Sequence, residues 1–533
     1  MTSSIRVDSP STPPALPTEE SARSQHTDEA FLASLGYRQE FRREFGMLEV
    51  FGLAFSLIGV VPSLASVLVY TIPNGGTSAM VWGWAISSFF IMFVGLAIAE
   101  LGSAAPTSGG LYYWTFIYSS PRTRNILSWI VAYMNTISFI SAISSVEWSC
   151  SVQIIAAVSI ASDLRFRPTT KELFGLYVAL LVCHGIIASL ATRALARLQN
   201  AFAVMTLLLC FAIIIALPIA TPNEFKNSAS YALKGFENLN GWPNSFAFIL
   251  SFIAPVWTIG GFDSAVHISE ESANARIAVP FAIITAVGMA GILGWAINVV
   301  LAFHMGTDTA SILSSPIGQP LAAIFFNSFG KKGTLIIWLF IIVVECILVC
   351  SRQTFAFARD GGLPFSTWIY RINPYTKTPV NGVWFAVSIA FLLGLLAFAG
   401  TAAFGATFSL SIAGQTVAYS IPITARFAFR NDFKPGPFRL GRFSFPVAVI
   451  AVTWMLFTTV IFLFPSTPQT DANDMNYAVV VFSGTLALSV GYYYFPKIGG
   501  KYWFRGPVAT IARVDAPRKL LAVEKVEELE AVK

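Results

Sequence analysis

Long apolar runs alternate with short polar segments along almost the whole chain. Each run has about 20 residues, the length that crosses the hydrocarbon core of a bilayer as a helix rising about 1.5 Å per residue. The runs lie at residues 49–70, 79–100, 126–149, 174–192, 199–220, 246–268, 280–304, 334–351, 380–399, 403–423, 446–465 and 476–495. The pattern therefore predicts an all-α polytopic membrane protein with about twelve transmembrane helices.

The polar ends of the chain complete the expected organisation. Residues 1–48 are rich in Ser, Thr and Pro and lack the basic start and short apolar run of a cleavable signal. We expect them to form a disordered cytosolic tail. Residues 49–495 form the predicted transmembrane domain, and residues 496–533 form a cytosolic C-terminal tail.

The distribution of basic residues predicts the orientation. With the N-terminus inside, 27 of the 34 Lys and Arg residues fall in cytosolic segments and 7 fall in outside loops. Cytosolic loops are the ones that carry an excess of Lys and Arg. Both termini are therefore expected in the cytosol, with the plasma membrane as the expected location and the vacuolar membrane as the alternative.

Composition excludes several classes of protein. The chain is 55% hydrophobic and only 12% charged, against roughly 25% charged in a soluble domain. The net charge of +6 is spread between the apolar runs, so the expected surroundings are a lipid bilayer and not a nucleic acid. There is no metal motif, nucleophile elbow or phosphate loop, and the four histidines are scattered. We expect no enzyme activity, metal or cofactor, and we expect transport of a small solute.

Two predicted spans contain residues that break helices. Span 1 is interrupted at residues 59–63 and span 6 at residues 260–264, which are the first helices of two units of five. Transporters with inverted repeats form their substrate sites at such paired breaks, although Gly and Pro also produce simple kinks. The candidate substrate-binding residues are Gly59, Val60, Val61, Pro62, Ser63, Trp257, Gly260, Gly261, Phe262 and Asp263.

Three acidic residues fall inside predicted spans. Glu147, Asp263 and Glu345 lie in spans 3, 6 and 8, and no Lys or Arg falls within a predicted span. A carboxylate in the hydrocarbon core needs a partner, so a substrate ammonium, a proton or a cation is expected; a protonated structural acid is the alternative. His267 follows Asp263 by four residues, which predicts a proton-sensitive pair or a histidine held by packing.

Charged residues at the cytosolic ends of spans 6 and 8 suggest an inner gate. Glu270 and Glu271 are expected to face the cytosol, and Arg352 and Arg359 follow span 8. Ion pairs between them would close the gate, while the alternative is surface pairing without a mechanical role. The candidates for ion coupling or gating are Asp263, His267, Glu147, Glu345, Glu271 and Arg352.

Three segments carry a resemblance to a known family. They are residues 105–112 (APTSGGLY), 261–271 (GFDSAVHISEE) and 351–364 (SRQTFAFARDGGLP). From about Phe51 to Pro507 the chain resembles the amino acid-polyamine-organocation superfamily, and within it the fungal amino acid and choline permease family. The resemblance implies a LeuT-like five-plus-five inverted-repeat core with two appended helices, and uptake by alternating access coupled to protons.

Smaller features of the sequence refine this resemblance. Residues 61–66 (VPSLAS) and 305–308 (MGTD) are most similar to the γ-aminobutyrate (GABA) permease branch. The span 1 break reads Gly-Val-Val-Pro, unlike the Gly-x-Gly type of many α-amino acid carriers, which disfavours an α-amino acid. Span 8 is short before Ser351, so either its helix continues through Ala358 or this copy lacks helical turns.

The sequence therefore predicts a proton-coupled permease for GABA or a similar ω-amino acid. Its ammonium would face acids or aromatic rings, and its carboxylate would face the start of a resumed half-helix, where the helix dipole is positive. The alternative within transport is choline, a polyamine or another organic cation. From a different class, the alternative is a nutrient sensor that binds its ligand without carrying it.

Overall fold

A computed structural model describes residues 28–39, 43, 45–190, 192–346, 366–369, 371, 373, 376, 380–465, 467–468 and 475–507. The chain divides into two compact units, Glu44–Val508 and a second unit made of Met1–Arg43 with Ala509–Lys533. Within the second unit residues 28–34 are helical, so helical structure occurs inside the segment predicted to be a disordered tail. All that follows concerns Glu44–Val508.

Helices make up this unit, and its described residues contain no β-strand. The twelve predicted spans correspond to α2 (Met47–Ile58) with α3 (Val60–Thr71), α4 (Gly76–Ser78) with η1 (Ala79–Gly83) and α5 (Trp84–Ala104), α7 (Arg124–Ala161), α8 (Thr170–Leu190), α9 (Thr192–Ala220), α11 (Asn244–Leu250) with α12 (Ile253–Thr258) and α13 (Ser264–His267), α14 (Ala275–His304), α16 (Pro320–Glu345), α19 (Val380–Gly394) with η4 (Leu395–Ala399), α20 (Thr401–Ala428), α21 (Ser444–Ile461) and α22 (Ala478–Tyr494). The connecting helices are α6 (Gly110–Tyr118), η2 (Asn223–Phe225), α10 (Ala229–Lys234), η3 (Ser269–Glu271), α15 (Thr309–Leu313), α18 (Ser366–Ile369), η5 (Gly441–Phe443) and α23 (Gly500–Trp503).

The lengths of these helices confirm the polytopic membrane fold. In the described part of the chain, nine helices are long and apolar enough to span a bilayer, and two shorter apolar helices cover Asn244–Thr258 and Ala478–Tyr494. The sequence placed the end of span 3 at residue 149, but α7 continues to Ala161. The predicted end was too early because polar residues such as Gln153 interrupt the apolar run without interrupting the helix.

The helix of span 8 differs most from its predicted bounds. It begins at Pro320 and not near residue 334, and its last described residue is Glu345. Gly330 has a φ of 64°, so two helical pieces meet there at a kink. Lys331 follows the kink and its Nζ lies 2.6 Å from Asp163 Oδ1. The predicted continuation toward Ala358 lies outside the described residues.

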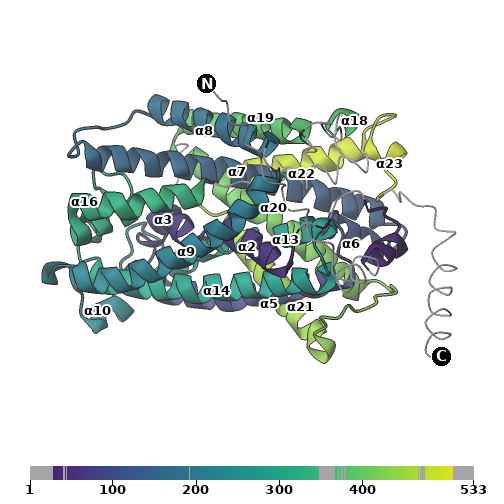
Figure 1. Ribbon diagram of the computed structural model, residues 1–533, viewed down its shortest axis with the longest axis horizontal. Helices are drawn as coiled ribbons and strands as arrows, with labels where there is room; N and C mark the ends of the chain where they lie inside the picture. The colour runs from purple at the N-terminus through teal and green to yellow at the C-terminus, as the bar shows by residue number, and fades with distance from the viewer. Residues whose placement is uncertain are drawn as a thin grey trace, which may run out of the picture. The chain divides into compact units, whose positions relative to one another are not determined.

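The two broken helices lie in the interior of the bundle (Figure 1). Helix α7 packs against α20, α16 and α8, while α14 packs against α5 and α2. Helix α3 contacts α12 and α16, and α12 also contacts α20. The breaks in spans 1 and 6 are therefore enclosed by long continuous helices that hold them in place.

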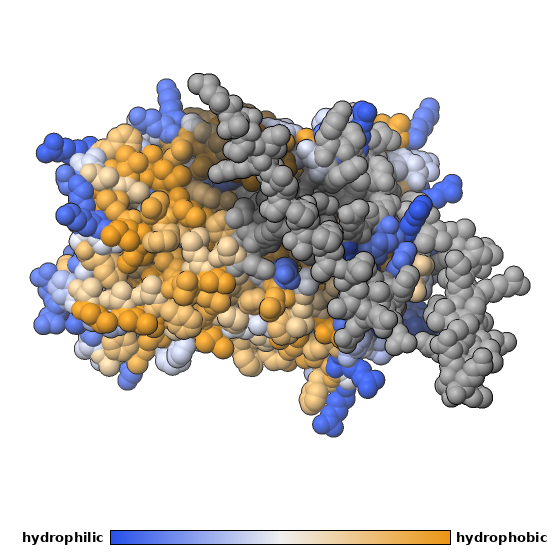
Figure 2. Space-filling model, viewed as in Figure 1, coloured by the Kyte–Doolittle hydropathy of each residue, from blue (hydrophilic) through white to orange (hydrophobic). Residues whose placement is uncertain are grey.

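The outward face of the bundle is apolar, as a lipid-exposed surface requires (Figure 2). Apolar residues cover the sides of the helices in this view, and hydrophilic residues gather at the left-hand edge, where helices end. Large apolar side chains are exposed on the flanks, including Leu190 (66%), Ile219 (77%) and Leu488 (75%). Such exposure would destabilise a soluble protein but suits a bilayer.

A buried ion pair fixes the loop between α20 and α21. Arg426 Nη1 lies 2.5 Å from Glu100 Oε2, at the end of α5. The same carboxylate accepts hydrogen bonds from Ser444 Oγ at 2.6 Å and from the Leu440 N–H at 3.1 Å. The Arg426 guanidinium also lies 3.7 Å from the centre of the Phe433 ring. Glu100 therefore joins span 2 to both ends of this loop.

Replacing Glu100 with glutamine should destabilise the protein strongly. Removing one charge of a buried pair leaves the other unpaired, which costs roughly 3–5 kcal/mol of unfolding free energy. A denaturant titration of the purified protein in detergent measures this cost. The matched control is Asp163→Asn, which breaks the exposed pair with Lys331 and should change stability little. Equal effects of the two substitutions would contradict a clamping role for Glu100.

Candidate functional site

The break in span 1 is a single left-handed residue. Gly59 has φ 49° and ψ 58°, so it ends α2 and α3 starts immediately after it. A residue with a β-carbon pays roughly 1–2 kcal/mol in this conformation. The Ser63 hydroxyl donates to the Ile58 carbonyl at 2.8 Å, which satisfies an acceptor left by the end of α2. Glycine and serine therefore stabilise a break at Gly59, the first residue of the predicted interruption, whereas residues 60–63 already belong to α3.

The break in span 6 is longer. Helix α12 ends at Thr258, and α13 begins at Ser264 after the non-helical Gly260 and Gly261. Gly261 has φ 73°, and nothing lies within 4 Å of where its β-carbon would stand. The main chain at Gly261 therefore borders open space in the direction in which any other residue would carry its side chain.

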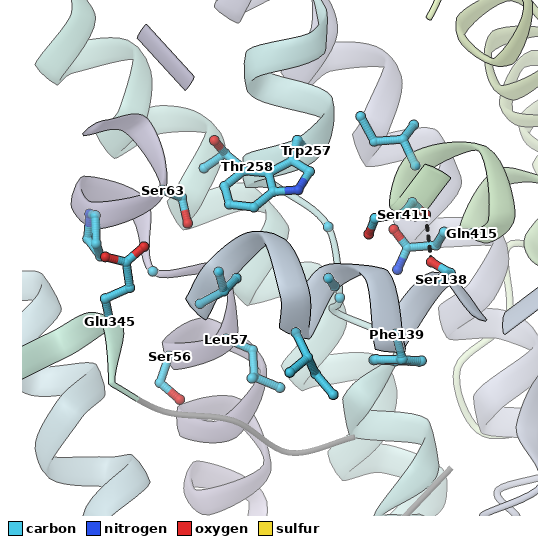
Figure 3. A pocket seen from close by; sticks show the side chains of 18 of the residues that line it. Ser56, Leu57, Ser63, Ser138, Phe139, Trp257, Thr258, Glu345, Ser411 and Gln415 are labelled. Carbon is cyan, nitrogen blue, oxygen red and sulfur yellow. Dashed lines mark hydrogen bonds between the residues drawn. The ribbon is translucent and has the colours of Figure 1, made fainter. Parts of the chain in front are cut away.

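Both breaks face one cavity of about 100 Å³, which we call the central cavity (Figure 3). Five helical segments supply its walls: the span 1 break, α7, the span 6 break, α16 and α20. Its described lining residues are Ser56, Leu57, Gly59, Pro62, Ser63, Ser138, Phe139, Ala142, Ile143, Val146, Trp257, Thr258, Gly260, Gly261, Val344, Glu345, Ser411, Ile412 and Gln415. Its small volume suits a solute of few heavy atoms.

The structure brings together most but not all of the predicted binding residues. Of the ten predicted residues, those that line the central cavity are Gly59, Pro62, Ser63, Trp257, Gly260 and Gly261. Four others are buried and absent from the lining, namely Val60, Val61, Phe262 and Asp263. Phe262 packs on the ring of Tyr419 at 5.6 Å between centroids. These four residues surround the breaks without facing the space between them.

Glu345 is the only ionisable residue among the described lining residues. Its side chain is buried, and its Oε1 accepts a hydrogen bond from Ser66 Oγ at 3.4 Å. Its Oε2 has no hydrogen-bond partner in the described part of the chain. Figure 3 shows Glu345 near Ser63, on the side of the pocket opposite Gln415 and Ser138. The cavity therefore has an acidic wall and an uncharged polar wall.

Asp263 and His267 form a polar pair behind the cavity wall. Both are buried, and Asp263 Oδ2 lies 3.4 Å from His267 Nε2. His267 Nε2 also lies 3.3 Å from Asn135 Nδ2 on α7, and His267 Nδ1 lies 3.0 Å from the Ser108 carbonyl. Asp263 Oδ1 accepts from Gln415 Nε2 at 3.4 Å. The predicted pair is thus formed, but it does not line the cavity.

The residues after span 6 hold the loop between α5 and α6. Glu270, expected to face the cytosol, is instead buried, and its Oε1 accepts from the N–H and hydroxyl of Ser108 at 3.0 and 2.6 Å. The sequence missed this because nothing in it pairs residue 108 with residue 270. The Glu271 carbonyl accepts from the Phe45 N–H at 3.0 Å. The other half of the predicted gate, Arg352, lies outside the described residues.

Glu147 has a partner that the sequence did not suggest. Its Oε1 lies 2.6 Å from His184 Nδ1 on α8, and Glu147 does not line the central cavity. The expectation of a substrate, proton or cation as its partner assumed that only Lys or Arg could pair with it. A histidine from the neighbouring span supplies the partner instead.

A larger cavity of about 580 Å³ lies at the end of the unit where α3 ends and α8, α16 and α20 begin. In the predicted orientation this end faces the outside. Among the described residues, the linings of the two cavities meet where Trp257 packs on Phe408 at 5.0 Å between ring centroids and where Ser66 contacts Glu345. Trp148 lines this outer cavity and stacks on Phe404 at 4.4 Å. A thin partition therefore divides the two spaces.

Two broken helices around a small cavity, with a second cavity behind a thin partition, are the arrangement expected of a carrier. The profile of the Amino acid permease family matches residues 45–485. The chain belongs to this family of amino acid permeases.

Named relatives cover nearly the whole permease. An uncharacterized amino-acid permease of Schizosaccharomyces pombe is 36% identical over 497 residues, or 92% of this chain and 90% of the relative. A GABA-specific permease of Saccharomyces cerevisiae is 37% identical over 92% of this chain and 87% of its own length. Amino-acid permease 2 of Neurospora crassa is 31% identical over 95% and 94%.

Sequence reasoning missed the polar wall that α7 and α20 give this permease. Gln415 and Ser411 on α20 and Ser138 on α7 line the cavity, and Ser138 Oγ donates to the Ser411 carbonyl at 2.6 Å. Serine is frequent in membrane helices and gives little signal by itself. Gln415 was the available signal, because a glutamine inside an apolar span needs a partner.

Proposed function

We propose that this permease carries GABA or a related ω-amino acid by alternating access, together with protons. We place it in the plasma membrane with both termini in the cytosol. The observation that carries the proposal is the central cavity, where the broken main chain of spans 1 and 6 faces the Glu345 carboxylate and no described basic side chain. The 37% identity to a GABA-specific permease supports the same class of solute.

The two walls of the cavity suggest how the solute lies. Its ammonium would pair with Glu345, whose Oε2 has no other described partner. Its carboxylate would lie at the opposite wall, where the Gln415 amide and the main chain of Gly260 and Gly261 face the cavity. An ω-amino acid carries its charges at opposite ends, whereas an α-amino acid carries both on one carbon. Separate acidic and amide walls therefore favour the ω-amino acid.

The coupled proton would be held between Asp263 and His267. A backbone carbonyl only accepts hydrogen bonds, so His267 Nδ1, which faces the Ser108 carbonyl, carries a hydrogen. In a neutral ring, Nε2 then presents a lone pair toward both the Asp263 carboxylate and the Asn135 amide nitrogen. A proton shared between Nε2 and Asp263 Oδ2 would relieve the repulsion between the lone pair and the carboxylate, so this pair is the proposed carrier of the coupled proton.

Replacing Glu345 with glutamine should raise the KM for GABA roughly 10- to 100-fold. Hydrogen bonds to charged groups contribute about 1.5–3 kcal/mol, and about 1.4 kcal/mol is tenfold in affinity. Counterflow of labelled solutes into proteoliposomes measures this for GABA, an α-amino acid, choline and a polyamine. The matched control is Glu147→Gln, which removes a buried acid outside the cavity lining and should leave the KM unchanged.

The same panel separates the proposed function from its rivals. Exchange of choline or a polyamine without exchange of GABA would mean that the solute is an organic cation and not an ω-amino acid. Equilibrium binding of GABA without counterflow by the well-folded protein would identify a sensor. An unchanged KM in Glu345→Gln would show that the ammonium lies elsewhere.

A further inference from the structure

Four polar side chains form a continuous path from the central cavity into the protein interior. Gln415 lines the cavity and contacts Asp263, Asp263 contacts His267, and His267 contacts Asn135. Asp263 is 0% exposed and His267 is 5% exposed. A solute in the cavity therefore has access to the buried pair only through an intermediate group, and Gln415 is the described side chain that reaches both.

The carboxamide of Gln415 lies between the buried Asp263 and the break in span 6. Its Nε2 lies 3.4 Å from Asp263 Oδ1. Its Oε1 packs against the span 6 break so closely that a β-carbon on Gly260 would stand 3.2 Å from it. In Figure 3 the side chain lies at the cavity wall beside Ser138 and Ser411. Gln415 thus joins α20 to the broken segment as well as to the buried acid.

A carboxamide suits this position because it does not titrate. Its N–H groups donate to a carboxylate, and its carbonyl accepts from a protonated carboxyl group. Besides Gln415, the described groups that reach the Asp263 carboxylate are the His267 ring and the Tyr419 hydroxyl. Among these groups, Gln415 is the one that also lines the central cavity.

We propose that Gln415 is the positioning residue that links solute occupancy of the central cavity to protonation of the Asp263–His267 pair. A solute carboxylate at the polar wall competes with Asp263 for the Gln415 N–H groups. When the amide turns to the solute, the Asp263 carboxylate loses a donor and its protonated form is favoured. Solute and proton are then bound together, which is the requirement for symport. This inference rests on the proposed function.

The groups around the Asp263–His267 pair connect it to the loop between α5 and α6. Tyr419, one turn beyond Gln415 on α20, approaches the Asp263 carboxylate, and α7 contributes the uncharged Asn135. His267 holds the Ser108 carbonyl, and Glu270 of η3 holds the N–H and hydroxyl of the same residue. His267 and Glu270 therefore hold the same residue of the loop between α5 and α6, which connects the Asp263–His267 pair to that loop.

The substitution Gln415→Met tests the link, because methionine has a similar length and no polar hydrogen. In the wild type, the KM should be lower for the proton-loaded form, and couplings of this kind are about 5- to 150-fold. In Gln415→Met the KM should rise at every pH, because the solute carboxylate loses the amide that faces it. The ratio of the KM at about pH 7 to the KM at about pH 5, measured by counterflow, should fall toward one. The matched control is the neighbouring Thr416→Val, since Thr416 bonds Thr459 and does not line the cavity.

A second variant, Gln415→Glu, tests the pH dependence of the KM, which a purely structural role of Gln415 would leave unchanged. Gln415→Glu places a second carboxyl group beside Asp263, and two like charges retain a proton to higher pH. The midpoint of the KM against pH should therefore move upward. An unchanged midpoint in Gln415→Glu, or a wild-type pH response in Gln415→Met, overturns the link. Absence of solute exchange in the wild type would instead overturn the proposed function, and exchange without any pH response would overturn the proton coupling and this link with it.

Discussion

Replacing Asp263 with asparagine should abolish concentrative uptake while leaving exchange of labelled solute nearly intact. Asparagine has almost the same shape, and its amide can donate to His267 Nε2, so the packing behind the cavity is kept. It cannot take up or release a proton between itself and the ring, which lies 3.4 Å away. Because Asp263 does not line the central cavity, solute binding itself should change little.

Proteoliposomes with an imposed pH gradient provide the measurement. The wild type should accumulate solute, and the Asp263→Asn protein should only equilibrate it, with an accumulation ratio near one. Asp163→Asn, a substitution of the same type at an exposed ion pair, is the control. Wild-type accumulation by Asp263→Asn across about pH 5 to 7 would identify Asp263 as a protonated structural acid. A large loss of equilibrium binding would mean that the carboxylate contacts the solute.

Replacing Gly59 with leucine should eliminate solute binding. Gly59 lines a cavity of only about 100 Å³, and a leucine side chain would occupy most of the space that a small solute needs. The backbone strain at φ 49° costs roughly 1–2 kcal/mol, which a folded membrane protein can tolerate. We therefore expect loss of counterflow with nearly normal yield of folded protein.

The alanine variant separates occupied space from strain. Gly59→Ala carries the same backbone strain, and its β-carbon would stand 3.4 Å from Pro62 Cγ, which is ordinary contact. Counterflow and size-exclusion profiles of the two variants in detergent make the comparison. Equal loss of transport in alanine and leucine variants, or loss of folded protein in both, would indicate that the left-handed backbone and not the open space is essential.

The broken helices could be located from the sequence because their causes are local. Gly59 has a left-handed backbone angle, and Gly260 and Gly261 occupy the non-helical stretch, so residue type alone indicates where each helix ends. The order and type of the twelve segments follow from apolar runs for the same reason. The exact ends of α7 and α16 do not, since helices continue past polar residues when these are buried against neighbours.

Contacts between spans could not be derived in the same way. The pairs Glu147–His184 and Ser108–Glu270, and the contact of Gln415 with Asp263, each depend on how a helix is rotated about its axis. In a soluble protein, the polar face of a helix reveals that rotation. A membrane helix is apolar toward both lipid and protein, so its sequence leaves the rotation undetermined.

Three glycines give part of the wall from spans 1 and 6 as bare main chain, and this limits how the specificity of such a protein can diverge at those positions. At Gly59, Gly260 and Gly261 there is no side chain to exchange, and the left-handed angles at Gly59 and Gly261 resist any other residue. Duplicated copies of the gene can therefore acquire new solutes only through the side chains around these glycines, among them Phe139, Glu345 and Gln415. The main chain at the glycines would bind what the solutes share, and the surrounding side chains would decide how they differ.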